Sequence, residues 1–195
     1  MKKQSPNACL LCGEELEYLS HEEPMQCVYC GRTFVSAARC KNGHYVCDEC
    51  HSRDGIAMIT EYCMQTQSRN PFEIMQILMR HPAIHMHGPE HHVLVGSALL
   101  AAYFNSGGQG NRKDLLELMA LRGGRVPGGV CGFWGSCGAG ISTGIFISLV
   151  TGATPTTEEN WGLSNCMTAT SLAAIGEVGG PRCCKRDSFI AVREA

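Results

Sequence analysis

The sequence predicts an all-α domain over residues 71–195, preceded by a small cysteine-rich module over residues 1–52 that has β-hairpin character. Three observations support this. Seven of the thirteen cysteines lie in the first fifty residues, mostly as closely spaced pairs. From about residue 71, apolar stretches of helical periodicity alternate with glycine pairs, and no strand-type alternation of useful length appears. Residues 53–70 are expected to form a linker or a connecting helix.

The composition limits what the chain is expected to bind. Hydrophobic residues make up 44% of the 195 positions, enough for a sizeable core, whereas charged residues make up only 17%, against roughly 25% in ordinary soluble domains. The formal net charge is −2, and no cluster of Lys and Arg exceeds two neighbours, so neither nucleic acid nor an anionic membrane is an expected partner. The longest apolar run, Ala139–Val150, is interrupted by serine and glycine and is too short to span a bilayer.

The cysteine count bears on the redox state of the chain. Thirteen is an odd number, so internal disulfides cannot pair every cysteine. The start MKKQSPNAC changes from polar residues directly to a cysteine motif, and we recognise no secretory signal in it. We therefore expect a cytoplasmic protein with reduced thiols that serve as metal ligands or nucleophiles.

The amino-terminal module carries residues of metal-ligand type and spacing. In a C-x-x-C turn, backbone N–H groups face the two sulfurs, and two such turns complete a tetrahedral site. The expected ligands are Cys9, Cys12, Cys27, Cys30, Cys40, His44, Cys47 and Cys50. Eight ligands predict two zinc ions, paired either in sequence order or interleaved as in RING-like modules, and the spacing does not decide between these pairings.

The zinc is expected to be structural, in a zinc-ribbon-like module with residues 32–35 in its hairpin. A segment of this size with few large apolar side chains needs a metal to fold. Rubredoxin-like iron is the alternative metal.

The helices of the second domain are recognised by proline, glycine or polar residues at their ends. The expected helices span 71–81, 89–105, 113–121, 138–150, 164–178 and 181–195, with Asn70 and Ser164 as caps. Because residues 138–150 are apolar nearly all round, we expect them to form the buried central helix.

Several cysteines of this domain fall at the expected helix starts. Cys137 comes just before the central helix, Cys166 lies in the first turn of the next, and Cys183 and Cys184 lie in the first turn of the last. Helix starts carry a positive partial charge and free N–H groups, which stabilise thiolates. The pattern predicts one shared thiol site, and the alternative is a set of small buried core residues.

A histidine-rich segment, HPAIHMHGPEHH, precedes the second expected helix. It predicts a titratable loop at the mouth of a pocket, and its candidates for proton transfer are His85, His87, Glu90, His91 and His92. A zinc ion held by His85, His87 or His91, as in a metal-dependent hydrolase, is an alternative.

Three motifs, HMHGPEHH, RGGRVPGGVCGFWGSCGAG and GGPRCCKRD, resemble a cysteine-rich family of unknown function found mainly in anaerobic prokaryotes. The resemblance covers most of residues 70–195. Members occur with or without the zinc module, sometimes near radical-SAM proteins, so a redox or radical-SAM partner protein is implied. The family brings no established activity.

The chain also distantly resembles the iron–sulfur L-serine dehydratases and the cysteine desulfidases, which have an all-α catalytic domain around an oxygen-labile 4Fe-4S cluster. Residues 135–138, Cys166 and residues 183–187 match their three cysteine elements. The match has departures: Arg182 intervenes after Pro181, Asp187 replaces an asparagine, and the spacing from Cys166 to Cys183 is longer. The serines of the family's Gly-Pro-Ser-Ser-Ser-His segment are also missing from the corresponding HGPEHH of this chain. This domain is far shorter than theirs.

Together these features predict an oxygen-sensitive 4Fe-4S enzyme of lyase or sulfur-transfer type, acting on a small carboxylate or thiol-containing substrate. Three thiolates leave one iron open as a Lewis acid or a sulfide carrier. The first-choice cluster ligands are Cys137, Cys166 and Cys183, with Cys131 or Cys184 as a fourth. Arg182, Lys185 or Arg186 would hold a carboxylate, unless they form a solvated helix face. The alternative function is a non-enzymatic zinc-ribbon adaptor that binds a partner protein.

Overall fold

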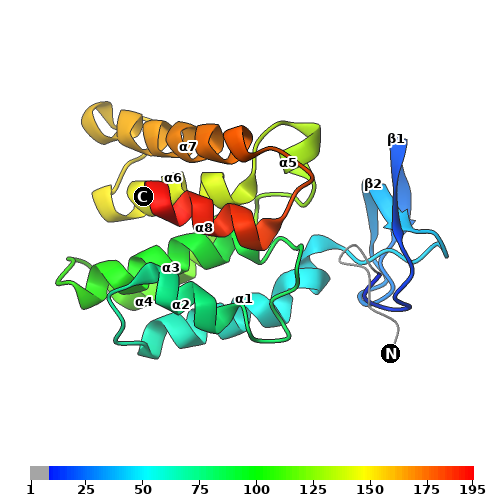
Figure 1. Ribbon diagram of the computed structural model, residues 1–195, viewed down its shortest axis with the longest axis horizontal. Helices are drawn as coiled ribbons and strands as arrows, with labels where there is room; N and C mark the ends of the chain where they lie inside the picture. Colours follow the sequence, from blue (N-terminus) through cyan, green and yellow to red (C-terminus); the bar gives the residue numbers. More distant parts are fainter. Residues whose placement is uncertain (1–8) are drawn as a thin grey trace. The chain divides into compact units, whose positions relative to one another are not determined.

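The computed structural model describes residues 9–195 (Figure 1). The chain contacts divide it into two compact units, one ending at His51 and the other spanning Ser52–Ala195. Helix α1 (Asp48–Gln65) begins in the first unit, and its later turns belong to the second. The residues expected to form a linker or connecting helix thus include most of α1.

The first unit is built on an antiparallel hairpin of β1 (Leu16–Gln26) and β2 (Thr33–Cys40). Its register pairs Gln26 with Thr33 at the turn and Leu16 with Cys40 at the open end, with an irregularity between Tyr18 and Glu23. The predicted hairpin is confirmed, although its strands extend well beyond residues 32–35.

The second unit is all-α, as predicted: every regular element described from residue 52 onward is a helix. After α1 the helices are α2 (Pro71–Leu78), α3 (His91–Asn105), α4 (Arg112–Gly123), α5 (Val130–Phe133), α6 (Gly138–Thr151), α7 (Glu158–Val178) and α8 (Cys184–Glu194). The predicted cap at Asn70 is also confirmed, since its side chain accepts a hydrogen bond from the Phe72 N–H at 3.0 Å. The short helix α5 was not predicted.

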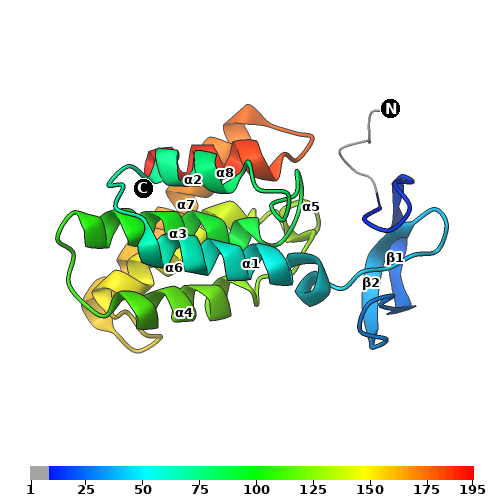
Figure 2. The same ribbon diagram turned by 90° about the horizontal axis from the view of Figure 1, so that it is seen from below.

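The central helix is α3 and not, as expected, the helix over residues 138–150. Every residue of α3 from His91 to Ala102 is buried, whereas several α6 side chains, Ile141 and Ile145 among them, are only half-buried. Helix α3 packs against α4 on one side and against α2 and α8 on the other (Figure 2). Apolar residues on all sides of α6 therefore indicate that it has several neighbouring helices. They do not show that it is the most buried helix, which is α3.

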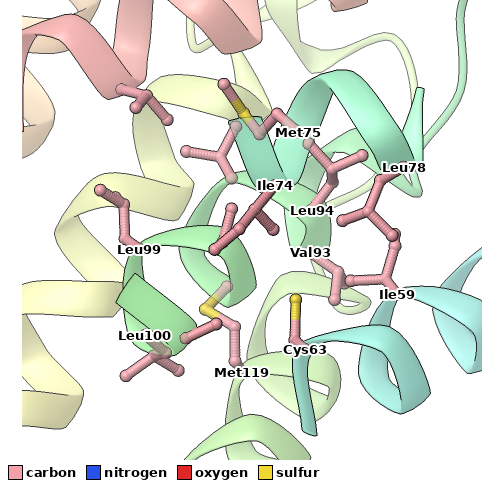
Figure 3. Packing of buried hydrophobic residues seen from close by; sticks show 14 of the residues in the cluster. Ile59, Cys63, Ile74, Met75, Leu78, Val93, Leu94, Leu99, Leu100 and Met119 are labelled. Atoms are coloured by element: carbon pink, nitrogen blue, oxygen red, sulfur yellow. The ribbon is translucent and has the colours of Figure 1, made fainter. Parts of the chain in front are cut away.

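The core forms around α3, whose side chains interdigitate with those of α1, α2 and α4 (Figure 3). Its fully buried members include Ile59, Ile74, Met75, Leu78, Leu94, Leu100 and Met119. At Gly96 the helices approach so closely that a Cβ would lie 2.3 Å from the sulfur of Met119. This packing fixes the start of α3, and with it His91 and His92.

Two predicted helix starts were wrong. Helix α7 begins at Glu158 with Thr157 as its cap, two turns before Ser164, so Cys166 lies in its third turn. Helix α8 begins at Cys184 with Cys183 as its cap, so the chain from Pro181 to Cys183 lies outside the helix. Acidic residues at the start of α7, Glu158 and Glu159, are the signal that the prediction overlooked.

Candidate functional site

The first unit contains two groups of side chains that can each hold a metal ion. One group is Cys9, Cys12, Cys40 and His44, and the other is Cys27, Cys30, Cys47 and Cys50. Within each group the ligand atoms all lie within 4.8 Å of one another. All eight predicted ligands are therefore gathered into sites of the size that a single ion requires.

The two groups are interleaved along the chain, which decides the pairing that the spacing left open. The first and third ligand pairs form one group, and the second and fourth form the other. The hairpin causes this, because its register returns Cys40 to the end where β1 began. Cys40 Sγ then lies 3.4 Å from Cys12 Sγ, and across the other group Cys30 Sγ lies 3.8 Å from Cys47 Sγ.

Backbone N–H groups face the sulfurs in these turns. The N–H groups of Leu11, Asn42 and Cys47 lie 3.4, 3.3 and 3.4 Å from the sulfurs of Cys9, Cys40 and Cys27. The backbone N–H of Glu14 lowers the pKa of Cys12 to about 6. Burial opposes ionisation of Cys27, but the N–H groups of Cys47 and Cys30 lower its pKa to about 6. The turns thus favour the thiolate, which is the metal-binding form, at Cys12 and Cys27, whereas burial raises the pKa of Cys40, Cys47 and Cys50.

In the second unit, two cysteines lie at helix starts, and their sulfurs face backbone N–H groups. Cys137 is the cap of α6; burial raises the pKa of its thiol, and the N–H groups of Ala139 and Gly140 oppose that rise. Cys184 is the first residue of α8. Burial raises the pKa of Cys184 to about 12, against the opposing effects of the Gly88 N–H and the charge of Arg182.

These two thiols share a neighbourhood with Cys131 of α5. Negative charge on Cys131 or Cys137 raises the pKa of Cys184, and charge on Cys131 raises that of Cys137. Figure 1 shows α5 and the starts of α6 and α8 at the same end of the helical unit. We call Cys131, Cys137 and Cys184 the thiol site.

The structure separates Cys166 from the thiol site, although the sequence placed it among the first-choice ligands. Helices α6 and α7 are antiparallel, and Gly140 faces Leu172 while Gly144 faces Thr168. Continuing that pairing places Cys166 opposite Phe146 of α6. Phe146 is nine residues from Cys137, which is about 13 Å along the helix at roughly 1.5 Å per residue. Cys166 is also exposed. Cys183 is the cap of α8 and precedes Cys184 in the chain.

Two of the predicted catalytic histidines are occupied by structural contacts. His91 is 1% exposed, and its Nδ1 and Nε2 lie 3.1 Å from Ser188 Oγ and 3.0 Å from the His85 carbonyl oxygen. Burial lowers the pKa of His91 to about 4. His92 Nδ1 lies 2.9 Å from the Val126 carbonyl oxygen, and its ring packs on Gly138 so closely that a Cβ there would lie 2.3 Å from Nε2.

The loop before α3 offers two other titratable groups. His85 Nδ1 lies 3.1 Å from a carboxylate oxygen of Glu90, which is fully buried and also accepts the His85 N–H at 2.9 Å. His87 faces Arg182 and Asp187. Burial and the charge of Arg182 lower its pKa, and its buried Nδ1 has no hydrogen-bond partner in the part of the chain that the structure describes.

The three predicted carboxylate-binding residues, Arg182, Lys185 and Arg186, have different surroundings. Lys185 Nζ donates to the Met79 carbonyl oxygen at 2.7 Å, at the end of α2. Arg186 donates to Asp187 at 2.9 Å and to the Gly179 carbonyl oxygen at 2.8 Å. Both therefore hold the fold together, whereas the charge of Arg182 acts on Cys184 and His87.

Comparison with known proteins gives one match. The model of a family described as "Family of unknown function (DUF5714)" matches residues 59–195. No curated protein and no solved structure matches the chain. The expected resemblance to the iron–sulfur L-serine dehydratases is not shown by any of these comparisons. Among the described residues, none of the helices has the length and apolar character needed to cross a membrane.

Proposed function

The chain belongs to the DUF5714 family of unknown function, and we propose that its helical unit is an oxygen-sensitive 4Fe-4S enzyme of lyase or sulfur-transfer type. Its substrate would be a small carboxylate or thiol-containing molecule. The cluster ligands would be Cys131, Cys137 and Cys184. The observation that carries the proposal is the shared neighbourhood of these three sulfurs at two helix starts.

The donor set fits such a cluster. N–H groups of Ala139, Gly140 and Gly88 face two of the sulfurs, and hydrogen bonds to sulfur are a normal part of iron–sulfur sites. The three sulfurs are not among the described groups whose ligand atoms all lie within 4.8 Å, as a single ion would need. The thiolates of a cubane bind different irons and therefore stand further apart. Three thiolates also leave one iron without a protein ligand.

The surrounding side chains suit an anionic substrate. When bound, the cluster would supply a Lewis acid for a hydroxyl or thiol leaving group, or a binding position for hydrosulfide. Arg182 would bind the substrate carboxylate, since its positive charge acts on both Cys184 and His87. His87 would accept a proton from the substrate, because burial and the charge of Arg182 favour its neutral ring.

For the first unit we propose two structural zinc ions. Seven thiolates and one imidazole in two closed groups of four are the donors that zinc takes in structural sites, and four protein ligands leave no position for a substrate. The unit would then be a metal-stabilised hairpin with interleaved sites, which differs from the single site of a simple zinc ribbon.

Anaerobic reconstitution of the full chain, followed by zinc, iron and sulfide analysis, tests both assignments. We expect two zinc ions and four iron ions per chain. Serine at Cys131, Cys137 or Cys184 should reduce iron to background, whereas Cys166→Ser, on the exposed face of α7, should retain it. A wild-type protein that holds zinc alone contradicts the cluster, and three zinc ions would point to a hydrolase that uses the histidine loop.

A non-enzymatic adaptor is the second candidate, and one observation favours it. The side chains between the ligands of the first two C-x-x-C turns are apolar, and they are 41–57% exposed: Leu10, Leu11, Val28 and Tyr29. Exposed apolar side chains on a metal-stabilised module suit contact with a partner protein. This reading predicts that the thiol site is redox-inert and that Cys137→Ser leaves the metal content unchanged.

A further inference from the structure

We infer that His91 is a positioning residue of the thiol site: it fixes the Cys184 sulfur by joining the start of α8 to the loop over residues 85–90. The inference deepens the proposed function, since Cys184 is one of the thiols assigned to the cluster. It gives His91 a different role from the proton transfer that the sequence suggested.

The side chain of His91 spans two segments that are distant in the sequence. His91 is the first residue of α3 and is 1% exposed. Its Nδ1 lies 3.1 Å from the hydroxyl of Ser188, which is 97 positions away in α8. Its Nε2 lies 3.0 Å from the carbonyl oxygen of His85 in the loop. One buried ring therefore ties α8 to the loop.

The same two segments hold Cys184. The Ser188 hydroxyl lies 2.7 Å from the Cys184 carbonyl oxygen, so the contact with His91 acts on the first turn of α8. The loop supplies the Gly88 N–H that faces the Cys184 sulfur. The loop is itself compact, because a Cβ at Gly88 would lie 2.0 Å from the Glu90 carboxylate. A shift of either segment would therefore move Cys184 or its N–H partner.

The partners of His91 also fix which nitrogen carries the proton. A carbonyl oxygen only accepts, so Nε2 must donate to His85, and in the neutral ring Nδ1 is then an acceptor. The hydroxyl proton of Ser188 is shared between Nδ1 and the Cys184 carbonyl oxygen. Because both ring nitrogens are engaged, His91 has no atom to offer a substrate and acts through Cys184.

Alkylation of individual cysteines in the zinc-loaded, cluster-free full chain tests the inference. A short pulse of N-ethylmaleimide, read by peptide mass spectrometry, gives a rate for each thiol. We expect the Cys184 rate to rise about tenfold in His91→Ala, since two buried hydrogen bonds no longer oppose local opening of α8. His91→Gln should show a smaller rise, because its amide can still donate to the His85 carbonyl group.

The chain provides its own controls. Cys63 is fully buried in the core and reports global unfolding, so its rate should not change. Ser188→Ala removes the hydrogen bond between His91 and α8, and it should also accelerate alkylation of Cys184. Ser171→Ala is the matched control: it deletes another buried serine contact, 2.9 Å to the Thr143 hydroxyl between α6 and α7, and should leave the Cys184 rate unchanged.

Three results would overturn the inference: an unchanged Cys184 rate in His91→Ala, a parallel rise at Cys63, or an equal rise in Ser171→Ala. Iron content is measured separately, which distinguishes this inference from the proposed function. A chain that takes up no iron but whose Cys184 responds to His91 contradicts the cluster and supports the positioning role. A chain that takes up the cluster but whose Cys184 alkylation rate does not change in His91→Ala supports the cluster and contradicts the positioning role.

Discussion

At the scale of single residues, burial and hydrogen-bond partners distinguish side chains of the same type. His91 and His92 are held by fixed contacts to Ser188 and Val126, while His87 faces Arg182. Lys185 donates to the Met79 carbonyl oxygen at the end of α2, and the charge of Arg182 acts on Cys184. Residue type alone predicts what a side chain can do, and its partners decide whether it remains available to do it.

His91 should make the stability of the protein depend on pH. Burial lowers its pKa from 6.5 to about 4, so between these values the unfolded chain binds a proton that the folded chain does not. The free energy of unfolding should therefore fall as the pH drops from about 6.5 toward 4, by about 3 kcal/mol in all. Urea unfolding followed by circular dichroism at a series of pH values measures this.

The control for this prediction is His91→Gln, which retains the same zinc ligands and cannot titrate in this range. Acid loss of zinc affects both proteins equally, so the difference between their pH profiles isolates His91. Parallel profiles would show that the pH dependence arises from other groups.

At the scale of elements, close helix packing determines the geometry of the second unit. Helices α6 and α7 approach through small residues, and a Cβ at Gly144 would lie 1.9 Å from the Thr168 hydroxyl and 2.7 Å from the Ser164 carbonyl oxygen. Because α6 begins beside Cys137, its position against α7 and α3 sets where that thiol lies.

We expect Gly144→Ala to lower the free energy of unfolding by about 1–3 kcal/mol, since the helices must separate to admit the methyl group. Gly162→Ala in α7 is the matched control. A Cβ there meets nothing within 4 Å, so the substitution should raise stability by about 0.5–1 kcal/mol through helix propensity. Urea titration of both variants gives the comparison, and equal effects would contradict the close approach.

At the scale of the whole molecule, the two units are stabilised in different ways. Five hydrophobic residues of the first unit are buried among those described, and all except Met25 are predicted ligands: Cys9, Cys27, Cys40 and Cys47. The second unit instead has a continuous core of aliphatic and sulfur-containing side chains. We therefore expect the first unit to depend on metal for its folding and the second to fold through apolar burial.

Removing metal with a chelator should therefore affect the units unequally. We expect the hairpin resonances of β1 and β2 to collapse in NMR spectra, because without metal the thiolates repel one another and few apolar contacts remain. The helical circular dichroism should largely persist, apart from fraying at the start of α1, where Cys50 lies. Cooperative loss of both signals would show that the helical unit also needs the metal.

Much of the fold follows from local signals in the sequence. Asn70 and Pro71 indicate the start of α2, and Cys-x-x-Cys spacing identifies the ligand turns. Both can be predicted because helix capping and turn geometry depend on residues that are neighbours in the sequence. The start of α7 differs from the expected one because Thr157 and the two acidic residues after it begin the helix two turns before Ser164. Cys131 was only an alternative ligand, since α5 was not predicted and nothing local links it to α8.

The sequence by itself determined an all-α unit, a hairpin module and eight residues of metal-ligand type. Only the tertiary structure decided that the ligand pairs interleave, because the return of β2 along β1 brings Cys40 to Cys12. It also decided that Cys184, and not Cys166, shares a neighbourhood with Cys137. The physical reason is the same in both cases: spacing along the chain fixes distances within a turn, whereas strand pairing and helix packing fix which turns meet.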